Sequence, residues 1–253
     1  MAEPDGSPPM SGGHDVGKRT DVIQRNITEL RERLAQACTA VGRSPDEVTI
    51  VAVTKTRPAT DVRILVHLGI CDIGENRDQE AVGKATACSD MELRWHFVGQ
   101  VQTRKARSVA SYAEVVHSVD RLRLVSALGA GAREADRTVH CLVQVNLDPV
   151  GYTGELATRG GVAPEEVLGL ADAIAAEPGL VVGGVMAVAP RESDPHQAFG
   201  VLGEVSVQLQ ARYPEATTVS AGMSADLEQA VAQGATHLRI GAALLGDRAT
   251  IVG

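Results

Sequence analysis

The sequence is poor in aromatic residues, which make up 2% of its 253 positions: two Phe, three Tyr and one Trp. A core for a chain of this length must therefore be built from Val, Leu, Ile and Ala. That composition suits packed strands and helices. The length allows one or two domains, and α/β barrels commonly reach this size as a single domain.

Excess positive charge and long apolar runs are also missing. The formal net charge of −8 argues against non-specific binding to nucleic acid. No stretch is long enough for a transmembrane helix, and the first residues contain no apolar signal core. The four cysteines are scattered without a CxxC pair, which is typical of free thiols in a reducing cytosol. We therefore expect a cytoplasmic protein that has no nucleic-acid or membrane partner.

The N-terminal residues 1–18 are rich in Pro, Gly and Ser, which predicts a disordered tail. A helix is expected to follow, with Asp21 as its cap and Gln24 three residues on, as in a capping box. Apolar residues then recur at helical spacing as far as Gly42. The folded domain is therefore predicted to span residues 19–253.

Strand patterns alternate with helical patterns through the rest of the chain. Strands are predicted over residues 48–53, 70–74, 94–99, 114–118, 140–146, 180–188, 217–220 and 237–240, and each is followed by a helical pattern. Such alternation indicates right-handed βαβ units in a parallel sheet. Eight units predict a closed (β/α)8 TIM barrel, in one domain with an extra N-terminal helix. A doubly wound open sheet is the alternative architecture.

The first predicted strand ends at Lys55. Carboxyl ends of parallel strands are where α/β sheets and barrels place their chemistry. A lysine amine at such a position can form a Schiff base with a carbonyl compound. The alternative interpretation is an ordinary surface lysine at the end of a strand.

Two segments follow the last two strands and together indicate a phosphate site. They are SAGMSAD (220–226) and RIGAALLG (239–246). Ser220 and Ser224 offer hydroxyls, and Gly222 and Gly241 allow backbone N–H groups to approach an anion. A helix starting near Ala242 would point its amino terminus at the phosphate. The alternative is that these are ordinary loop glycines and a helix cap.

A lysine on the first strand and a phosphate site across the barrel mouth suit a phosphorylated aldehyde. Arg239 carries donors only, so an arginine facing a pyridine nitrogen would keep that nitrogen unprotonated. The alternative role for Arg239 is a surface ion pair. We interpret Trp95 and His96 as packing beside the site and His117 as structural.

These stretches resemble a known family. The matching motifs are AVTKTRP (52–58), IGENRDQE (73–80), WHFVGQVQTRKAR (95–107), HSVDR (117–121), QVN (144–146), GVMAV (184–188), SAGMSAD (220–226) and RIGAALLG (239–246). In this order they resemble the pyridoxal phosphate homeostasis proteins, which are similar to the N-terminal barrel domain of alanine racemase. The resemblance runs from about Asp21 to Asp247.

The resemblance implies roles for seven residues in binding pyridoxal 5′-phosphate. Lys55 corresponds to the Schiff-base lysine, Asn76 to a pocket residue near the ring, and Arg239 to the partner of the pyridine nitrogen. The phosphate site corresponds to Ser220, Met223, Ser224 and Gly241. Ala242 stands where the family commonly has Thr, so we expect weaker cofactor binding rather than its loss. Arg77 stands where many members have Tyr.

The resemblance also implies a function. It indicates a non-enzymatic protein that holds pyridoxal phosphate on a lysine, takes part in vitamin B6 and amino-acid homeostasis, and supplies recipient pyridoxal-phosphate enzymes. A monomer or weak dimer is expected. The alternative is a pyridoxal-phosphate-dependent amino-acid racemase or related barrel enzyme, which would need a second acid/base group. Tyr152, after the fifth strand, is a weak candidate, and the chain ends at Gly253 without room for the second domain of alanine racemase. We favour the carrier.

Overall fold

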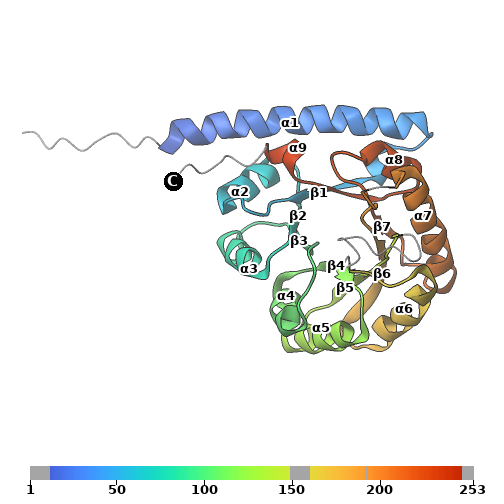
Figure 1. Cartoon of the computed structure of the whole chain (residues 1–253). Coiled ribbons are helices and arrows are strands. Elements are labelled where there is room, and N and C mark those ends of the chain that lie inside the picture. Colours follow the sequence, from blue (N-terminus) through green and yellow to red (C-terminus); the bar gives the residue numbers. More distant parts are fainter. Residues whose placement is uncertain (1–11, 149–159, 192, 247–253) are drawn as a thin grey trace, which may run out of the picture.

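The computed structural model describes residues 12–148, 160–191 and 193–246. Within them, eight parallel strands close into a barrel in chain order, and the helices that follow the strands surround it (Figure 1). The (β/α)8 prediction is thus confirmed, and the open doubly wound sheet is excluded because β1 pairs with β8.

The boundaries of the elements follow the predicted rhythm closely. The strands are β1 (Thr49–Val53), β2 (Asp72–Glu75), β3 (Arg94–Phe97), β4 (Val115–Val119), β5 (Val139–Gln144), β6 (Leu180–Met186), β7 (Thr218–Ser220) and β8 (His237–Ile240). The helices are α1 (Gly12–Ala40), α2 (Ala59–His67), α3 (Asp78–Ala87), α4 (Ala106–Tyr112), α5 (Leu122–Glu134), α6 (Val167–Ala176), α7 (Pro195–Arg212), α8 (Leu227–Ala232) and α9 (Ala242–Leu245). Short 3-10 turns occupy Pro45–Glu47, Thr103–Lys105 and Pro164–Glu166.

Closure of the barrel determines what meets at its mouth. Ala52 of β1 stands beside Ile240 of β8, and Val53 stands beside Gly74 of β2. All strands run in the same direction, so the segments that follow them gather at one end of the barrel. The core between sheet and helices is mainly aliphatic, as the scarcity of aromatics predicts.

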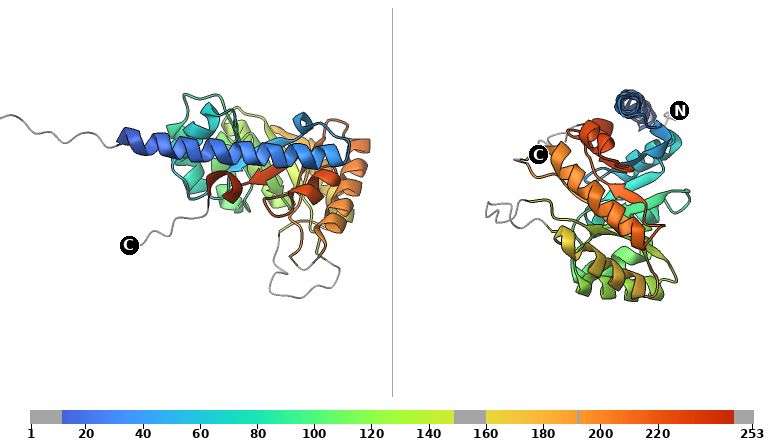
Figure 2. Two further views of the ribbon diagram at one scale, coloured as in Figure 1. Left: turned by 90° about the horizontal axis from the view of Figure 1, so that it is seen from above. Right: turned by 90° about the vertical axis from the view of Figure 1, so that its right-hand side faces the viewer.

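The extra N-terminal helix is longer than the sequence suggested. Helix α1 has 29 residues and lies along α2, α8 and α9 across one side of the barrel (Figure 2). It buries one face, formed by Ile23, Ile27, Leu30 and Leu34, each at most 3% exposed. This stripe has the spacing of an amphipathic helix that packs against a core.

The expected boundary of the disordered tail, at residue 18, differs from the structure. Residues 12–18 belong to α1, so Asp21 lies inside the helix instead of capping it. After Gly13 no residue breaks the helix, and adding turns to an existing helix needs no new nucleus. The first eleven residues of the predicted tail lie outside the described residues.

The cysteines and the absence of a membrane-spanning segment were also predicted from the sequence. All four cysteines are free thiols, as predicted. Across the described ranges, no helix combines the length and apolar character needed to cross a membrane. Residues 149–159, which include the candidate Tyr152, lie outside the described residues.

Candidate functional site

A cavity of about 480 Å³ opens where β1, β2, β7 and β8 end. Its lining consists of Val53, Lys55, Thr56, Arg57, Asn76, Val98, Val188, Met223, Ser224, Ala225, Arg239, Gly241, Ala242, Leu245 and Gly246. Six of the seven residues predicted for the site line it, drawn from four separate stretches of the chain; Ser220 does not. The structure therefore brings Lys55, the segment after β7 and the segment after β8 together.

Lys55 is the lysine that lines the cavity. Among the described residues it has no hydrogen-bond or ion-pair partner, and its side chain is exposed in the cavity. The next residue, Thr56, adopts the left-handed backbone conformation with φ of 62°, which is unfavourable for a β-branched residue. The Thr56 N–H donates to Glu80 Oε2 over 2.7 Å, which holds this turn in place.

A buried ion pair lies beneath the same turn. Lys84 of α3 donates from Nζ to Glu75 Oε1 at 2.5 Å and to the Thr54 carbonyl at 2.6 Å. The Thr54 hydroxyl donates to the same Glu75 oxygen. Burial raises the pKa of Glu75, opposed by the hydrogen bonds from Lys84 and Thr54. This network ties the end of β1, immediately before Lys55, to β2 and α3.

Asn76 lines the cavity and holds an unpaired acceptor in its side chain. Its Oδ1 is buried and has no hydrogen-bond partner in the described structure. Its backbone is fixed by the close approach of Gly99, where an added Cβ would lie 2.4 Å from the Asn76 carbonyl oxygen. A glycine is therefore required at position 99 if Asn76 is to stay in place.

The segments after β7 and β8 form a cradle of backbone N–H groups at the cavity. Ser224, Ala225, Gly241 and Ala242 line the cavity, and their backbone N–H groups have no acceptor among the described residues. Gly222 shapes the first segment with φ of +89°, a conformation that side chains strongly disfavour. Clustered free N–H groups in such segments attract anions.

Helix α1 holds this cradle from behind. Arg33 Nη1 donates to the Ser224 carbonyl at 2.7 Å, and Asn26 Nδ2 donates to the Leu244 carbonyl at 2.9 Å. Arg19 Nη2 reaches the Leu245 carbonyl at 3.1 Å and also binds Asp61. The extra helix thus satisfies carbonyls that α9 and the segment after β7 would otherwise leave unpaired.

Arg239 is a buried cation in the floor of the cavity. It is 6% exposed, and in the part of the chain that the structure describes it forms no ion pair. Nη1 donates to the carbonyl and hydroxyl of Ser220, both at 2.7 Å, and Nη2 donates to the Ala187 carbonyl at 2.8 Å. Burial lowers the pKa of Arg239 to about 10, which still leaves it charged at neutral pH. The alternative of a surface ion pair is therefore wrong.

Ser220 lies in a different place from the one that the phosphate prediction assumed. It is fully buried inside the barrel, where its hydroxyl receives Arg239 and contacts His117 Nδ1 at 2.9 Å. Of the two serines, Ser224 is the one that lines the cavity. His117 is buried in the barrel interior, which agrees with its structural interpretation.

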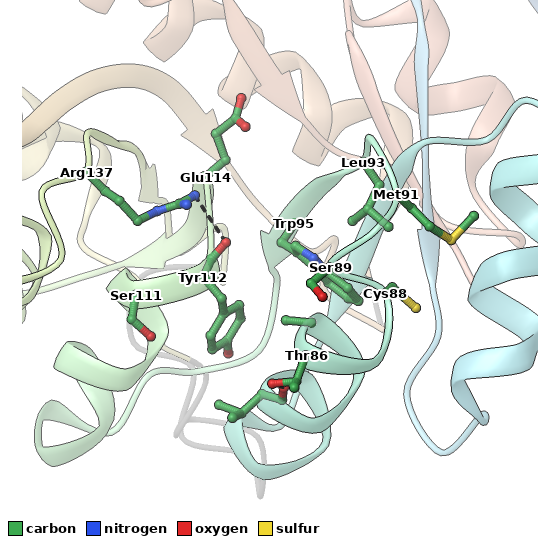
Figure 3. Close-up of a pocket in the computed structure, with 12 residues that line it drawn as sticks. Thr86, Cys88, Ser89, Met91, Leu93, Trp95, Ser111, Tyr112, Glu114 and Arg137 are labelled. Carbon is green, nitrogen blue, oxygen red and sulfur yellow. Dashed lines mark hydrogen bonds between the residues drawn. The ribbon is translucent and has the colours of Figure 1, made fainter.

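Another cavity, of about 470 Å³, lies outside the barrel between the end of α3, the start of β3 and the end of α4 (Figure 3). Trp95 and Tyr112 face each other across it, and Arg137 donates to the Tyr112 carbonyl at 3.3 Å. None of the seven predicted site residues lines this cavity, and its lining contains no lysine. It therefore cannot form a Schiff base and is not the candidate site.

Several supporting residues escaped the sequence analysis. Lys84 lies in α3, whose sequence is that of a polar surface helix. Arg33 and Asn26 lie on the polar side of α1. A usable signal existed for Lys84, because a carboxylate at the end of a buried strand, Glu75, needs a cation nearby. No comparable signal points to Arg33 or Asn26.

The chain is similar to known proteins along most of its length. The family model of the alanine racemase N-terminal domain matches residues 20–249. A pyridoxal phosphate homeostasis protein from Pseudomonas aeruginosa is 39% identical over 229 residues, which cover 89% of this chain and 96% of that protein. One from Escherichia coli K12 is 35% identical over 232 residues, covering 89% of this chain and 97% of that protein.

Solved structures of other proteins share the fold of this chain. PipY from Synechococcus elongatus, solved with pyridoxal phosphate bound, is 30% identical with a TM-score of 0.75, covering 88% of this chain and 100% of that chain. An alanine racemase from Clostridium difficile has a TM-score of 0.68 at 11% identity, covering 92% of this chain and 61% of that chain. The likeness to the racemase is one of fold alone.

We predict that replacing Lys84 by Met destabilises the protein by about 3–5 kcal/mol, because the buried Glu75 carboxylate would lose its cation. Urea unfolding followed by circular dichroism measures this. The double variant Glu75→Gln/Lys84→Met should recover at least half of the loss. Arg63→Met, which breaks an exposed ion pair with Asp90, is the control and should leave the stability nearly unchanged. Equal effects of the two single variants would contradict the prediction.

We predict that the free energy of unfolding falls as the pH drops from 6.5 towards 4. Burial lowers the pKa of His237 to about 4 and that of His117 well below its ordinary value. Unfolded histidines titrate near pH 6.5, so the unfolded state binds more protons in this range. Each of these histidines should contribute a slope of the unfolding free energy against pH that approaches about 1.4 kcal/mol per pH unit.

Urea unfolding at several pH values between 5 and 7 measures the slope. His237→Gln should flatten it, whereas the exposed control His67→Gln should not. A wild-type stability that stays constant over this range would show that these histidines titrate normally in the folded protein.

Proposed function

The chain belongs to the family of pyridoxal phosphate homeostasis proteins, built on the alanine racemase N-terminal domain, and we propose that it carries pyridoxal 5′-phosphate in the cavity at the barrel mouth. The observation that carries the proposal is one cavity that contains both an unpaired lysine amine and a cluster of unpaired backbone N–H groups. An aldehyde that also bears a phosphate is the ligand class that uses both. PipY, a relative at 30% identity, has been solved with this cofactor bound.

Each part of the cavity matches a part of the cofactor. The N–H groups of Ser224, Ala225, Gly241 and Ala242 would hold the phosphate, and Lys55 would supply the amine that bonds to the aldehyde carbon with loss of water. Asn76, whose buried Oδ1 has no partner among the described residues, would lie near the ring of the cofactor.

Arg239 would face the ring nitrogen with the donors that it does not use in the protein. Its Nε–H and one Nη2–H have no acceptor among the described residues. Because an arginine donates and does not give up its proton, a ring nitrogen beside it stays an unprotonated acceptor. When bound, the cofactor supplies a reactive aldehyde and an electron-accepting ring, and this contact weakens the second property.

The lining of the cavity favours a carrier over an enzyme. Within the described residues that line it, no Asp, Glu, His, Cys or Tyr accompanies Lys55. Racemisation needs a second acid/base group opposite the lysine, so this lining gives no support to a two-base mechanism. In the proposed function, the protein contributes to vitamin B6 and amino-acid homeostasis and passes the cofactor to recipient enzymes. It would do so in the cytoplasm, as a monomer or weak dimer.

We predict that purified protein mixed with pyridoxal phosphate becomes yellow, and that borohydride reduction fixes a pyridoxyl group on Lys55. Peptide mapping by mass spectrometry locates the adduct. Lys55→Ala should lose it, whereas Lys18→Ala, which removes an exposed lysine of α1, should keep it. An adduct spread over surface lysines would overturn the site, and sustained production of a D-amino acid from L-alanine or L-serine would overturn the carrier.

We predict that Ala242→Thr tightens binding of pyridoxal phosphate roughly two- to tenfold, because a hydroxyl at the start of α9 adds one hydrogen bond to the phosphate cradle. Ser224→Ala removes a hydroxyl from the same cavity and should weaken binding by a similar factor. Fluorescence titration gives both dissociation constants. Unchanged affinity in both variants would place the phosphate elsewhere.

A further inference from the structure

A line of polar side chains, all buried except the partly exposed Asp72 at one end, crosses the barrel interior, where (β/α)8 proteins usually place branched aliphatic residues. Its members come from five different elements. The contacts are Asp72 Oδ1 to His96 Nε2 at 2.9 Å, His96 Nδ1 to His117 Nε2 at 2.8 Å, His117 Nδ1 to Ser220 Oγ at 2.9 Å, and Ser220 Oγ to Arg239 Nη1 at 2.7 Å. The line runs from the start of β2 to the floor of the cavity.

The chemistry of the two ends gives this line a direction. A guanidinium can only donate and an ionised carboxylate can only accept. Burial acts to raise the pKa of Asp72, but the hydrogen bond from His96 and the nearby basic groups of His96, Arg94 and His237 together outweigh burial and keep that pKa below its ordinary value. Asp72 is therefore an anion at neutral pH, and His96 Nε2 must carry the proton between them.

The positions of the protons in the other contacts of the line follow from this assignment. A neutral His96 protonated on Nε2 has an acceptor at Nδ1, so His117 must donate from Nε2. His117 then accepts at Nδ1, and the hydrogen atom in that contact is the hydroxyl proton of Ser220. The Ser220 oxygen is left to receive Arg239. Every contact is satisfied with one orientation, from Arg239 to Asp72.

We propose that Ser220, His117, His96 and Asp72 form a one-way hydrogen-bond relay that positions Arg239 for the cofactor, with both histidines neutral and protonated on Nε2. The proposal deepens the proposed function and rests on it for the identity of the ligand.

The charges around the relay favour neutral histidines. The line already contains a cation at Arg239 and an anion at Asp72, so its charge is balanced when both histidines are neutral, and a cation on His117 would be repelled by Arg239. Arg94 lies 3.5 Å from Asp72 Oδ1, and the His237 ring centre lies 6.2 Å from that of His96. Burial, with His96 and Arg239 nearby, keeps the pKa of His117 well below its ordinary value.

The relay has a consequence for the cavity. Because the Ser220 hydroxyl is committed to His117, it cannot turn towards a ligand, and it holds one side of the Arg239 guanidinium. The Ser220 and Ala187 carbonyls hold other donors of the same group. Because Arg239 lines the cavity, the donors that remain are held in a fixed orientation there, as precise recognition of a ring nitrogen requires.

The direct test is side-chain nitrogen NMR of the full-length protein labelled with ¹⁵N-histidine and free of cofactor. Long-range ¹H–¹⁵N spectra distinguish protonated from unprotonated ring nitrogens. His96→Gln and His117→Gln assign the two signals, and the exposed His67→Gln is the control. Both residues should be neutral and protonated on Nε2 at pH 7. A proton on His117 Nδ1, or a doubly protonated His96, would overturn the relay.

A second test measures positioning. Ser220→Ala should weaken binding of pyridoxal phosphate roughly tenfold, because a charged hydrogen bond to Arg239 is lost, and should shift the absorption maximum of bound cofactor. Ser206→Ala removes another buried hydroxyl, in α7, and should change neither. If Ser220→Ala and Ser206→Ala have the same affinity and the same absorption maximum, Ser220 does not position Arg239.

The two proposals fail in different ways. If wild-type protein binds no pyridoxal phosphate, the proposed function fails, while the NMR spectrum still reports the relay. If the cofactor binds Lys55 but the histidines show the other tautomer, the carrier stands and the relay fails.

Discussion

The pairing of β1 with β8 is the constraint on which the site depends. It places the turn with Lys55 beside the segment that starts at Gly241, which lies 186 positions further along the chain of 253 residues. Without closure, the amine and the free N–H groups would belong to opposite edges of a sheet. Closure also encloses an interior in which side chains from β2, β3, β4, β7 and β8 contact one another.

Two kinds of support hold the mouth of this barrel. Beneath Lys55, the buried pair of Lys84 and Glu75 fixes the end of β1 from the side of α3. Behind the phosphate cradle, Asn26 and Arg33 of α1 occupy the carbonyls of the last segments. The side chains that would touch the cofactor are thus set by residues that never reach it, which is how a rigid binding site is built.

The sequence predicted the architecture well because periodicity is a local property. Apolar strand runs and helical spacing are visible residue by residue, and Lys55 could be placed at the mouth once the first strand was recognised. Arg239 lines the candidate cavity, although its lack of an ion pair among the described residues could not be predicted. The boundary of the N-terminal tail was misjudged, because residues 12–18 have the composition of a tail but continue a helix anchored elsewhere.

Ser220 illustrates the limit of such prediction. A serine at the end of a three-residue strand can point to the mouth or into the interior, and the tilt of the strands decides which. The histidine line is equally invisible in the sequence, because His96, His117 and Ser220 lie on separate strands and meet only after closure. Pairwise contacts between distant strands carry no periodic signal.

The central claim is that the unpaired amine and the unpaired N–H groups serve one ligand, and a crystal structure of the protein with pyridoxal phosphate tests it most directly. The account predicts the aldehyde carbon bonded to Lys55 Nζ, the phosphate against the N–H groups of Ser224 and Ala242, and the ring nitrogen beside Arg239. Cofactor found in the outer cavity between α3 and α4, or bonded to a surface lysine with the mouth empty, would contradict it.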